Sequence, residues 1–423
     1  MRFNNLQDWL SWQENLNPKT IDLGLDRVQL VLKSLGLSST FVCPVITVAG
    51  TNGKGSAVAL CESILSAAGY SVGCYTSPHL FAYNERIRID GQNISDARLC
   101  DAFEKIDQAR GDVRLTYFEF GTLAALLIFA EQKPDVVVLE VGLGGRLDAV
   151  NVIDADVALI TTVDIDHVDW LGHDIETIAA EKAGILRSQR PGIYGGLRLP
   201  KTVKQKADEV NAALYVAGRD YIFQSVGPNL WQFIGPEVRY ADLPRPALKG
   251  DFQLQNAAAV IMALSQLQSR LPVTEQAIMA GLQQASLPGR FQCLQLNPLV
   301  IVDVAHNPQA AQSVASMLQQ QEISGKTLAV VAMLADKAID EVVAIMGPVV
   351  DAWFTAGLAV PRGLAADSMA KAVKAHRSDA KLWPSQTVVD ACRQAMQQAT
   401  PQDRIIVFGS FYTVTEACNY FKG

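Results

Sequence analysis

Short β-branched runs alternate with helix-length amphipathic stretches along most of this chain, and this alternation limits the fold more than any other feature. Val45–Ala49 has the length and composition of a buried strand, and residues 57–68 carry apolar side chains at helical spacing. Residues 135–141 and 156–163 are apolar almost throughout, as expected for strands that are covered on both faces of a sheet. The pattern predicts an α/β fold in which helices flank a mostly parallel sheet.

The pattern changes twice, and these changes divide the chain. Residues 215–243 consist of short runs separated by Gly- and Pro-containing breaks, which predicts a small antiparallel addition. Residues 287–296 are rich in turn formers, and the α/β alternation resumes after them. The sequence therefore predicts an N-terminal domain over residues 1–286, a linker over residues 287–296 and a second doubly wound α/β domain over residues 297–423.

Composition and charge exclude several classes of protein. The 423 residues include 36 Lys plus Arg and 43 Asp plus Glu, and the resulting net charge of −7 disfavours sequence-independent nucleic-acid binding. No stretch approaches the roughly 18 consecutive apolar residues of a membrane span, and the first residues lack the pattern of a secretory signal. Seven scattered cysteines without a C-x-x-C pair indicate reduced thiols. We expect a globular, cytoplasmic protein that binds neither nucleic acid nor membranes.

A glycine-rich loop, Gly50-Thr-Asn-Gly-Lys-Gly-Ser56, follows the first predicted strand and precedes the first predicted helix. Successive backbone N–H groups at a helix N-terminus bind anions. Lys54 adds a cation that can reach the β- and γ-phosphates of a nucleotide, and Ser56 offers a hydroxyl to Mg²⁺. The glycine spacing departs from the usual phosphate loop, so the loop is a variant. A tight turn with an exposed lysine is the alternative, and the flanking strand and helix favour phosphate binding.

Carboxylates follow two other predicted strands. Glu140 lies near the end of an apolar strand, where a buried carboxylate needs a cation: either a magnesium ion or Arg146. The loop Asp164-Ile-Asp-His-Val-Asp-Trp170 places three aspartates beside His167 after the next strand. Ligand sites of α/β sheets lie at the carboxyl ends of the strands, which favours a metal role for Glu140. For His167, chemistry alone leaves a metal ligand and a structural histidine evenly balanced.

Ten motifs, taken in order, resemble those of the folylpolyglutamate synthases, which are Mur-ligase-like enzymes, and they span nearly the whole chain. The motifs are Gly50-Thr-Asn-Gly-Lys-Gly-Ser56, Tyr75-Thr-Ser-Pro-His79, Asn84-Glu-Arg-Ile87, Thr116-Tyr-Phe-Glu119, Glu140-Val-Gly-Leu-Gly-Gly-Arg-Leu-Asp148, Asp166-His167, Glu181-Lys-Ala-Gly-Ile185, Leu287-Pro-Gly-Arg-Phe291, Asp303-Val-Ala-His-Asn-Pro308 and Gly409-Ser410. The segment Thr20-Ile-Asp-Leu-Gly-Leu-Asp-Arg27 is similar to the bacterial bifunctional form, dihydrofolate synthase/folylpolyglutamate synthase. The resemblance implies an N-terminal ATPase domain and a C-terminal Rossmann-like domain.

The resemblance also implies roles for individual residues. Those that would bind ATP are Thr51, Asn52, Gly53, Lys54, Gly55, Ser56, Asn256, Arg290 and Asp303. Those that would line the pterin site are Asp22, Leu23, Gly24, Leu25, Thr116, Tyr117, Phe118, Glu119, Leu147, Asp148 and Ala149. Those that would ligate magnesium are Ser77, Glu140 and His167. The expected catalytic residues are Lys54, Lys182 and His306.

For two of the expected catalytic residues, a structural role is the alternative to the catalytic one. Lys182 matches the lysine that is carbamylated in this family, although without the resemblance it is better explained as a surface lysine on an amphipathic helix. His306 matches a histidine near the glutamate substrate or the phosphates, and its alternative is a neighbour of the helix cap at Asn307.

The implied reaction joins L-glutamate to a carboxylic acid at the expense of ATP. The acid would be dihydropteroate, which gives dihydrofolate, or the γ-carboxylate of a reduced folate tail. ATP would first convert the acid into an acyl phosphate, with two magnesium ions and Lys54 offsetting the repulsion between the anions. Closure of two domains, with residues 287–291 near the hinge, would exclude water. The sequence shows no long apolar seam, so we expect a monomer.

Three other functions remain open on the residues alone. A peptidoglycan Mur ligase shares the phosphate loop but has a uridine-nucleotide domain of about 100 residues before it, whereas 49 residues precede Gly50 here. A nucleotide-dependent switch would hydrolyse ATP without regard to glutamate or folate. A folylpolyglutamate synthase restricted to chain extension would lack the dihydropteroate reaction.

Overall fold

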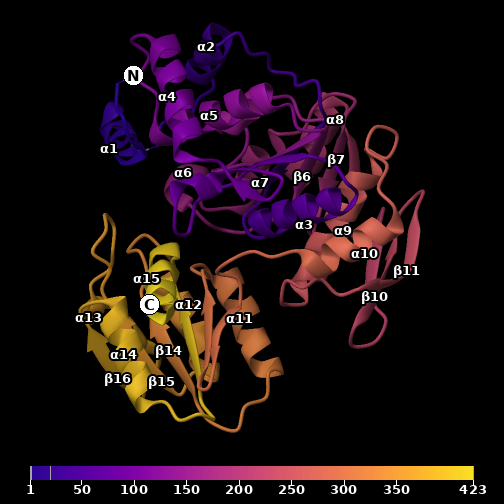
Figure 1. Cartoon of the computed structure of the whole chain (residues 1–423). Helices are drawn as coiled ribbons and strands as arrows, with labels where there is room; N and C mark the ends of the chain where they lie inside the picture. The colour runs from indigo at the N-terminus through magenta and orange to yellow at the C-terminus, as the bar shows by residue number, and fades with distance from the viewer. Residues whose placement is uncertain (1, 20, 423) are drawn as a thin grey trace. The chain divides into compact units, whose positions relative to one another are not determined.

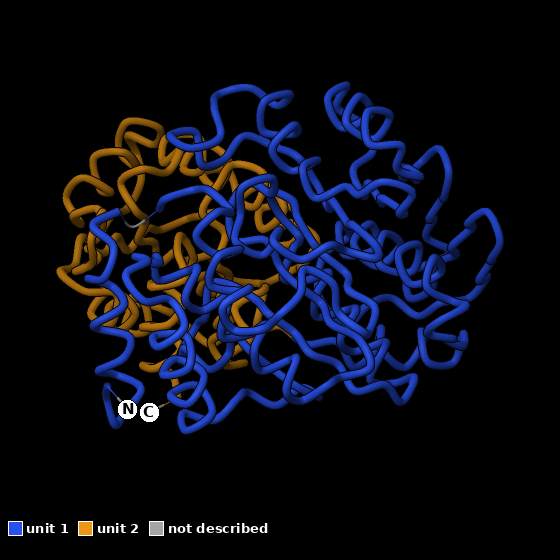
Figure 2. The backbone as a smooth tube through the Cα atoms, turned by 90° about the horizontal axis from the view of Figure 1, so that it is seen from above, with its two compact units in different colours: residues 1–286 blue, residues 287–423 orange. Residues whose placement is uncertain are grey.

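Two units make up the chain in this computed structural model, which describes residues 2–19 and 21–422: Met1–Ser286 and Leu287–Gly423 (Figure 2). We call them the first and the second unit. Thr20, which begins one of the family-like segments, lies outside the described residues.

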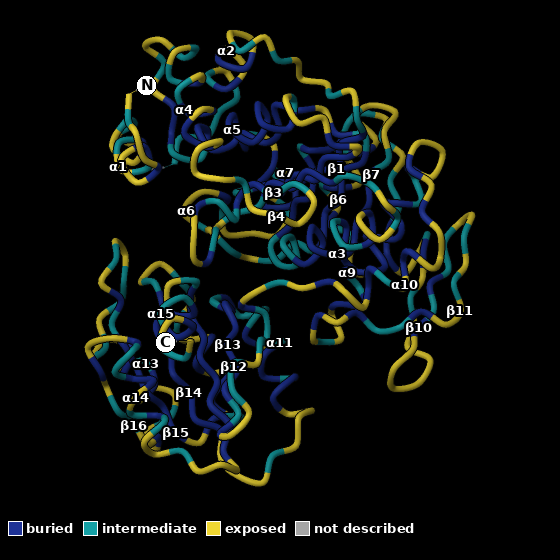
Figure 3. Tube along the Cα trace, in the orientation of Figure 1, coloured by how far each residue is buried: buried dark blue, intermediate teal, exposed yellow. Residues whose placement is uncertain are grey.

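The first unit is built on a sheet of eight strands, in which β2 and the five strands after it in the order are parallel. Its strands, in spatial order, are β4 (Gln92–Asn93), β3 (Ile87–Ile89), β2 (Val72–Tyr75), β5 (Val136–Glu140), β1 (Val45–Ala49), β6 (Val157–Ile160), β7 (Pro191–Tyr194) and β8 (Ala213–Val216). The central strands β1 and β5 are buried along their whole length. Figure 3 shows the buried interior of this unit in dark blue. The apolar composition of β1 and β5 therefore reflects cover on both faces, as the sequence predicts.

The helices of the first unit pack on this sheet, and α3 contacts β1, β2 and β5 as well as α9 and α10 (Figure 1). The α5 helix contacts β2 and α4, and it shares a hydrophobic core with alternate residues of β5. The helices and 3-10 turns of this unit are α1 (Leu6–Leu16), α2 (Asp26–Ser34), α3 (Lys54–Ala67), η1 (Tyr83–Arg86), α4 (Asp96–Arg110), α5 (Tyr117–Gln132), η2 (Ala149–Val152), α6 (Val168–Leu171), α7 (Ile175–Ala183), α8 (Lys201–Val210), α9 (Phe252–Ser265) and α10 (Glu275–Gln284).

A separate antiparallel sheet of three strands precedes α9 and confirms the predicted addition. It consists of β9 (Ile222–Ser225), β10 (Leu230–Ile234) and β11 (Arg239–Pro244). Residues 215 and 216, which the sequence assigns to this addition, instead belong to β8 of the main sheet, where Tyr215 pairs with Ile193. The local pattern misleads here because β8 is an edge strand, and its partner β7 is distant in sequence.

The second unit has a six-stranded sheet that is parallel except for one edge strand. Its strands, in spatial order, are β12 (Gln292–Leu296), β13 (Leu299–Asp303), β17 (Arg404–Phe408), β14 (Thr327–Val331), β15 (Ala352–Ala356) and β16 (Lys381–Ser385). Its helices and one 3-10 turn are α11 (Pro308–Gln320), α12 (Ile339–Met346), η3 (Gly347–Val349), α13 (Ala366–His376), α14 (Val388–Gln398) and α15 (Phe411–Lys422). The segment expected as a linker is shorter than predicted, because its second half is strand β12.

Both predicted α/β folds are therefore present, with the antiparallel addition in the first unit. Within the described part of the chain, none of the helices combines the length and the apolar character needed to cross a membrane.

Candidate active site

The glycine-rich loop connects β1 to α3 at the carboxyl end of the sheet, and two of its glycines are required by close contacts. Gly50 and Gly53 both have positive φ, 148° and 87°. A Cβ atom on Gly50 would lie 1.9 Å from Thr161 Oγ1, and one on Gly53 would lie 2.6 Å from Asn256 Oδ1. No side chain fits either position. These glycines therefore allow the loop to pack closely against β6 and α9.

The same loop is fixed to the segment that follows β6. Thr51 donates its backbone N–H to the Thr162 carbonyl at 2.8 Å, and its hydroxyl donates to the Asp164 carbonyl at 3.0 Å. The Asn52 carbonyl accepts hydrogen bonds from the hydroxyls of Thr161 and Thr162, at 2.7 and 3.1 Å. The loop thus has a defined geometry that rests on two neighbouring strand ends.

Lys54 is the first residue of α3, and its side chain folds back over the loop. Its ammonium group donates to the carbonyls of Gly50 and Thr51, at 3.0 and 3.2 Å. The cation therefore lies at the helix N-terminus, where the backbone dipoles also favour an anion.

Helix α9 brings a further polar pair to the start of α3. Asn256 donates to Gln253 Oε1 at 3.0 Å, and Gln253 donates to the Ser56 hydroxyl at 3.2 Å. All three side chains are buried. The sequence predicts Ser56 and Asn256 but not Gln253. Its position three residues before Asn256, on the same helix face, is the signal that could have found it.

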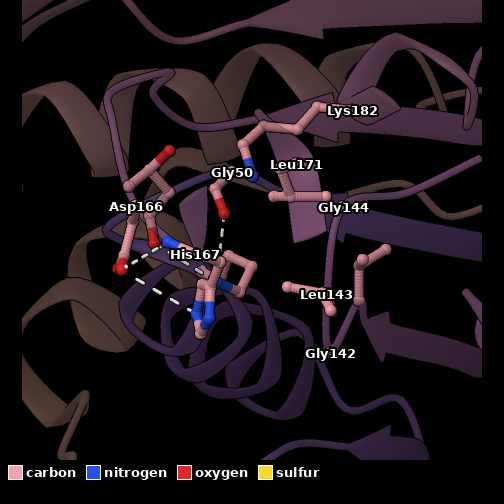
Figure 4. Close-up of a pocket in the computed structure, with 11 residues that line it drawn as sticks. Gly50, Gly142, Leu143, Gly144, Asp166, His167, Leu171 and Lys182 are labelled. Carbon is pink, nitrogen blue, oxygen red and sulfur yellow. Dashed lines mark hydrogen bonds and ion pairs between the residues drawn. The ribbon is translucent and has the colours of Figure 1, made fainter. Parts of the chain in front are cut away.

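A pocket opens beside the phosphate loop (Figure 4). Residues that follow three strands and residues from three helices line it: Gly50, Thr51, Lys54, Val141, Gly142, Leu143, Gly144, Asp166, His167, Leu171 and Lys182. The structure thus brings Lys54, His167 and Lys182 together, three residues that the sequence places far apart.

Lys182 is only 3% exposed, so the alternative of a surface lysine is wrong. Its side chain runs from α7 into the pocket (Figure 4). Burial, together with the positive charge of Lys54, lowers the pKa of this amine to about 7, although nearby carboxylates such as Asp166 oppose the shift. The main chain of Lys182 packs closely against Gly145, where an added Cβ would lie 3.0 Å from the Lys182 Cα. The lowered pKa makes the neutral form of the Lys182 amine accessible near neutral pH.

His167 has a strained backbone, with φ of 53° in a region that residues other than glycine seldom adopt. Its N–H donates to Asp166 Oδ1 at 2.8 Å, and its ring Nε2 lies 4.0 Å from Asp166 Oδ2. The helix α6 begins immediately after it. Strain of this kind is retained where a side chain must be presented at a fixed place, as at ligand sites.

Ser77 and Glu140 lie together but do not line that pocket. The Ser77 N–H donates to Glu140 Oε2 at 3.1 Å, and Glu140, the last residue of β5, is 5% exposed. The alternative partner for Glu140, Arg146, instead pairs with Glu181 at 2.7 Å. No cluster of three or more His, Cys, Asp or Glu side chains that could hold a metal was found in the described residues. A carboxylate and a hydroxyl still suit Mg²⁺, which commonly keeps water and phosphate oxygens as its other ligands.

The segments expected to bind a pterin come together on the first unit. The Gly24 N–H donates to the Leu147 carbonyl at 3.2 Å, which joins residues 22–25 to residues 147–149. Arg27 adds the segment 116–119, because it pairs with Glu119 at 2.9 Å and with Asp22 at 3.0 Å. Three stretches that are separate in sequence therefore meet.

Two of the residues expected there act as a helix cap. Thr116 and Glu119 form a reciprocal capping box at the start of α5, with the Thr116 N–H donating to Glu119 at 2.7 Å. The cap fixes the start of the helix and with it Phe118, whose ring packs so closely on Gly142 that a Cβ there would lie 2.6 Å away.

Asp148 is a buried carboxylate in this region, at 3% exposure. It accepts hydrogen bonds from the N–H groups of Leu143 and Val150, at 2.8 and 3.0 Å. Burial nevertheless raises the pKa of Asp148 to about 6, and these hydrogen bonds and Lys54 only partly offset that effect.

Three residues that the resemblance assigns to ATP binding or catalysis belong to the second unit: Arg290, Asp303 and His306. Asp303 ends β13 and accepts from the N–H groups of Phe291 and Ala305, both at 2.8 Å, while burial raises its pKa and Arg290 partly offsets this. His306 Nδ1 lies 2.8 Å from the Val304 carbonyl. Because a carbonyl only accepts, Nδ1 carries the proton. The helix cap itself is Asn307, which accepts from the Ala310 N–H.

Comparison with known proteins agrees with this arrangement. The Mur ligase middle domain matches residues 48–264, and the Mur ligase glutamate ligase domain matches residues 289–411. Both units therefore have the domain types of Mur ligases.

The similarity extends to whole proteins. The dihydrofolate synthase/folylpolyglutamate synthase of Escherichia coli K12 is 46% identical over 409 residues, which are 97% of this chain and 94% of that protein. The structure of E. coli FolC in complex with DHPP and ADP matches with a TM-score of 0.93 and 44% identity, over 99% and 98% of the two chains. The structure of a bifunctional folylpolyglutamate synthase/dihydrofolate synthase with Mn, AMPPNP and L-glutamate bound matches with a TM-score of 0.90 and 44% identity. The match covers 99% of this chain and 98% of that chain. The chain belongs to the dihydrofolate synthase/folylpolyglutamate synthase family.

Proposed function

We propose that this protein joins L-glutamate to dihydropteroate, which yields dihydrofolate, and to the γ-carboxylate of reduced folate tails, using ATP. The observation that carries the proposal is the convergence of the phosphate loop, the Lys182 pocket and the expected pterin segments at loops of the first unit. The relatives bind ADP or AMPPNP, a metal ion, DHPP and L-glutamate, which are the ligands this reaction needs.

The phosphate loop performs the first chemical task. A carboxylate is a poor acylating group because oxide does not leave, and transfer of the γ-phosphoryl group gives it a leaving group. The N–H groups of residues 53–56 and the Lys54 ammonium bind the phosphates and offset the repulsion between the approaching anions, while the N–H groups of Thr51 and Asn52 hold the loop to Thr162. The acid attacks the γ-phosphorus, ADP leaves, and an acyl phosphate results.

The second task is amide formation. The amine of glutamate attacks the acyl carbon, and phosphate leaves from a tetrahedral intermediate. The second unit carries the glutamate ligase domain, and we assign its His306 to this step and its Arg290 and Asp303 to nucleotide binding. With Nδ1 donating to the Val304 carbonyl, the imidazole of His306 has a fixed orientation.

The residues present suit magnesium. Ser77, Glu140 and His167 supply a hydroxyl, a buried carboxylate and an imidazole, and the phosphates of ATP supply the remaining oxygens. We assign these residues to two ions. Bound there, magnesium supplies positive charge that neutralises the phosphate oxygens.

We assign Lys182 as a carbamylated lysine. An amine adds to CO₂ only when it is neutral, and the pKa of about 7 makes the neutral form accessible near neutral pH. The product, Nζ–COO⁻, forms with release of one proton. It replaces a positive charge near Lys54 with a negative one, and it offers oxygen atoms in a pocket that also holds His167. Repulsion between two cations thereby becomes attraction.

Release of ADP tests the whole proposal. ADP formation is measured with dihydropteroate, L-glutamate and magnesium, with each omitted in turn, and we expect sustained release only when all are present. Oxygen-18 in the substrate carboxylate should appear in the released phosphate. Turnover that ignores glutamate and folate would indicate a nucleotide switch instead. Size-exclusion chromatography with light scattering tests our further proposal that the protein is a monomer.

Asp22 separates the two activities. Its carboxylate faces Arg27, which also holds Glu119 at the start of α5. We expect Asp22→Ala to lower kcat/KM with dihydropteroate about 10-fold more than with a reduced folate, because the chain-extension substrate has additional contacts along its tail. Asp26→Ala, which removes an exposed acid of the same segment, is the control. Equal losses in both reactions would contradict a separate pterin contact.

Asp148 gives the pterin site a pH dependence. Its pKa of about 6 means that the carboxylate is ionised above pH 6 and neutral below it. An ionised carboxylate accepts hydrogen bonds from the N–H groups of a pterin more strongly, so we expect dihydropteroate affinity to fall as the pH is lowered from 7.5 to 5. Titration of binding by fluorescence at several pH values measures this. Asp148→Asn should bind about 10-fold more weakly at pH 7.5 and flatten the profile; a wild-type affinity that does not change with pH counts against the assignment.

A further inference from the structure

Arg86 is a buried cation for which the described residues provide no carboxylate. It is the last residue of η1 and is 9% exposed. None of the ion pairs found in the described part of the chain includes it, whereas Arg88, two residues later, pairs with Glu62 at 2.8 Å. A buried charge without an opposite charge is costly, so such a residue needs another form of compensation.

Aromatic rings and a histidine provide part of that compensation. The guanidinium carbon lies 5.2 Å from the ring centre of Tyr83 and 5.5 Å from that of Tyr117. Its Nε–H donates to His79 Nδ1 at 2.9 Å. Burial raises the pKa of Tyr75 to about 12, and the charge of Arg86 opposes this rise, so Tyr75 also lies near it. These groups are neutral, and they orient the cation without cancelling its charge.

The position of Arg86 matches the place where the acid substrate must react. Tyr117 belongs to the segment assigned to the pterin site, and His79 is two residues after Ser77, which is assigned to magnesium. The Arg86 carbonyl also accepts from the Thr76 N–H at 2.9 Å, which holds Arg86 beside the segment that contains Ser77. A substrate whose ring system lies at the pterin site and whose carboxylate reaches the magnesium site must therefore bring that carboxylate close to Arg86.

We propose that Arg86 binds the carboxylate of the acid substrate and thereby selects acids over neutral analogues. The proposal rests on the proposed function, because it concerns that reaction's substrate. An arginine presents a planar set of donors that matches a carboxylate, and Arg86 has further N–H groups beyond those bonded to His79 Nδ1 and to the Tyr75 hydroxyl. Arg86 thus determines specificity and positions the nucleophilic oxygen for attack.

The test compares two ligands that differ only in charge: dihydropteroate and its carboxamide. Dissociation constants are measured by fluorescence without ATP or metal, for the wild type, Arg86→Gln and Arg88→Gln. We expect the wild type to bind the acid about 10- to 100-fold more tightly than the amide, and Arg86→Gln to lose most of that ratio while binding the amide as before. Arg88→Gln, which breaks an existing ion pair of the same segment, should keep the wild-type ratio.

Two outcomes overturn the inference: an unchanged ratio in Arg86→Gln, or equal weakening of both ligands, which would show that Arg86 only supports the fold. If Arg86→Gln does not fold, Arg86→Lys is measured in its place, and the ratio should fall at least about threefold because lysine lacks the planar set of donors. An unchanged ratio in Arg86→Lys likewise overturns it. Failure of the wild type to release ADP with dihydropteroate and glutamate would refute the proposed function instead.

Discussion

Replacing Lys54 with alanine is expected to lower kcat at least about 1,000-fold in both glutamate ligations and to leave the first unit folded. The loss is large because Lys54 is the cation at the helix N-terminus to which we assign binding of the transferred phosphoryl group. The substitution removes the hydrogen bonds from Lys54 to the Gly50 and Thr51 carbonyls, but the fold should survive because the hydrogen bonds from Thr51 to Thr162 and Asp164 still hold the loop.

The measurement is ADP release under saturating substrates, with thermal unfolding followed by circular dichroism on the same sample. Lys204→Ala is the matched control, because Lys204 is a half-exposed lysine of α8 whose partner is Asp208. It should keep wild-type activity. A Lys54→Ala variant that retains more than about a tenth of the wild-type rate would refute the role assigned to this lysine.

Replacing Lys182 with alanine is expected to lower kcat about 100-fold or more, and added acetate or propionate should restore part of the activity. The reason is that a carbamate would supply negatively charged oxygens in the pocket beside His167 and Lys54, and a small carboxylate can occupy the space that the truncated side chain leaves. Lys182→Arg keeps a positive charge and fills the space, so it should be inactive without rescue.

The carbamate itself is observed by ¹³C NMR with labelled bicarbonate, in which the wild type should show a carbamate signal that Lys182→Arg lacks. The signal should increase as the pH rises through 7, because the neutral amine is the reactive form and its pKa is about 7. Activity should fall in buffer depleted of CO₂ and return when bicarbonate is added. Full activity without CO₂, together with no labelled signal, would contradict carbamylation.

The sequence predicts the strands and helices near the phosphate loop well because their signals are local. Buried parallel strands such as β5 are continuous apolar runs, and α3 follows its glycine loop directly. The edge strands are harder, because β8 and β12 are defined by partners and not by their own composition. Residues 215 and 216 were therefore assigned to the wrong sheet, and β12 was taken for part of a linker.

The residues of the candidate site also fall into two groups: those that a local sequence pattern reveals and those whose environment depends on the folded chain. The Gly50 loop carries its own signal in glycine spacing, and Glu140 stands out as a carboxylate in an apolar strand. The burial of Lys182 could not be predicted, because it depends on packing against Gly145, a contact that α7 alone does not reveal. Arg86 lies in the motif Asn84-Glu-Arg-Ile87, but that motif does not reveal that Arg86 has no carboxylate partner among the described residues, which is a property of the folded chain.

The tethers between the phosphate loop and the end of β6 have a consequence for binding kinetics. The hydroxyls of Thr161 and Thr162 donate to the Asn52 carbonyl, so hydrogen bonds within the protein itself fix the conformation of the loop. The receiving amides are already organised, so little conformational entropy is lost when a triphosphate arrives. The association rate of the nucleotide should therefore be set by diffusion and charge. Substitutions that remove the hydrogen bonds of Thr161 and Thr162 should slow nucleotide association more than they slow the chemical steps.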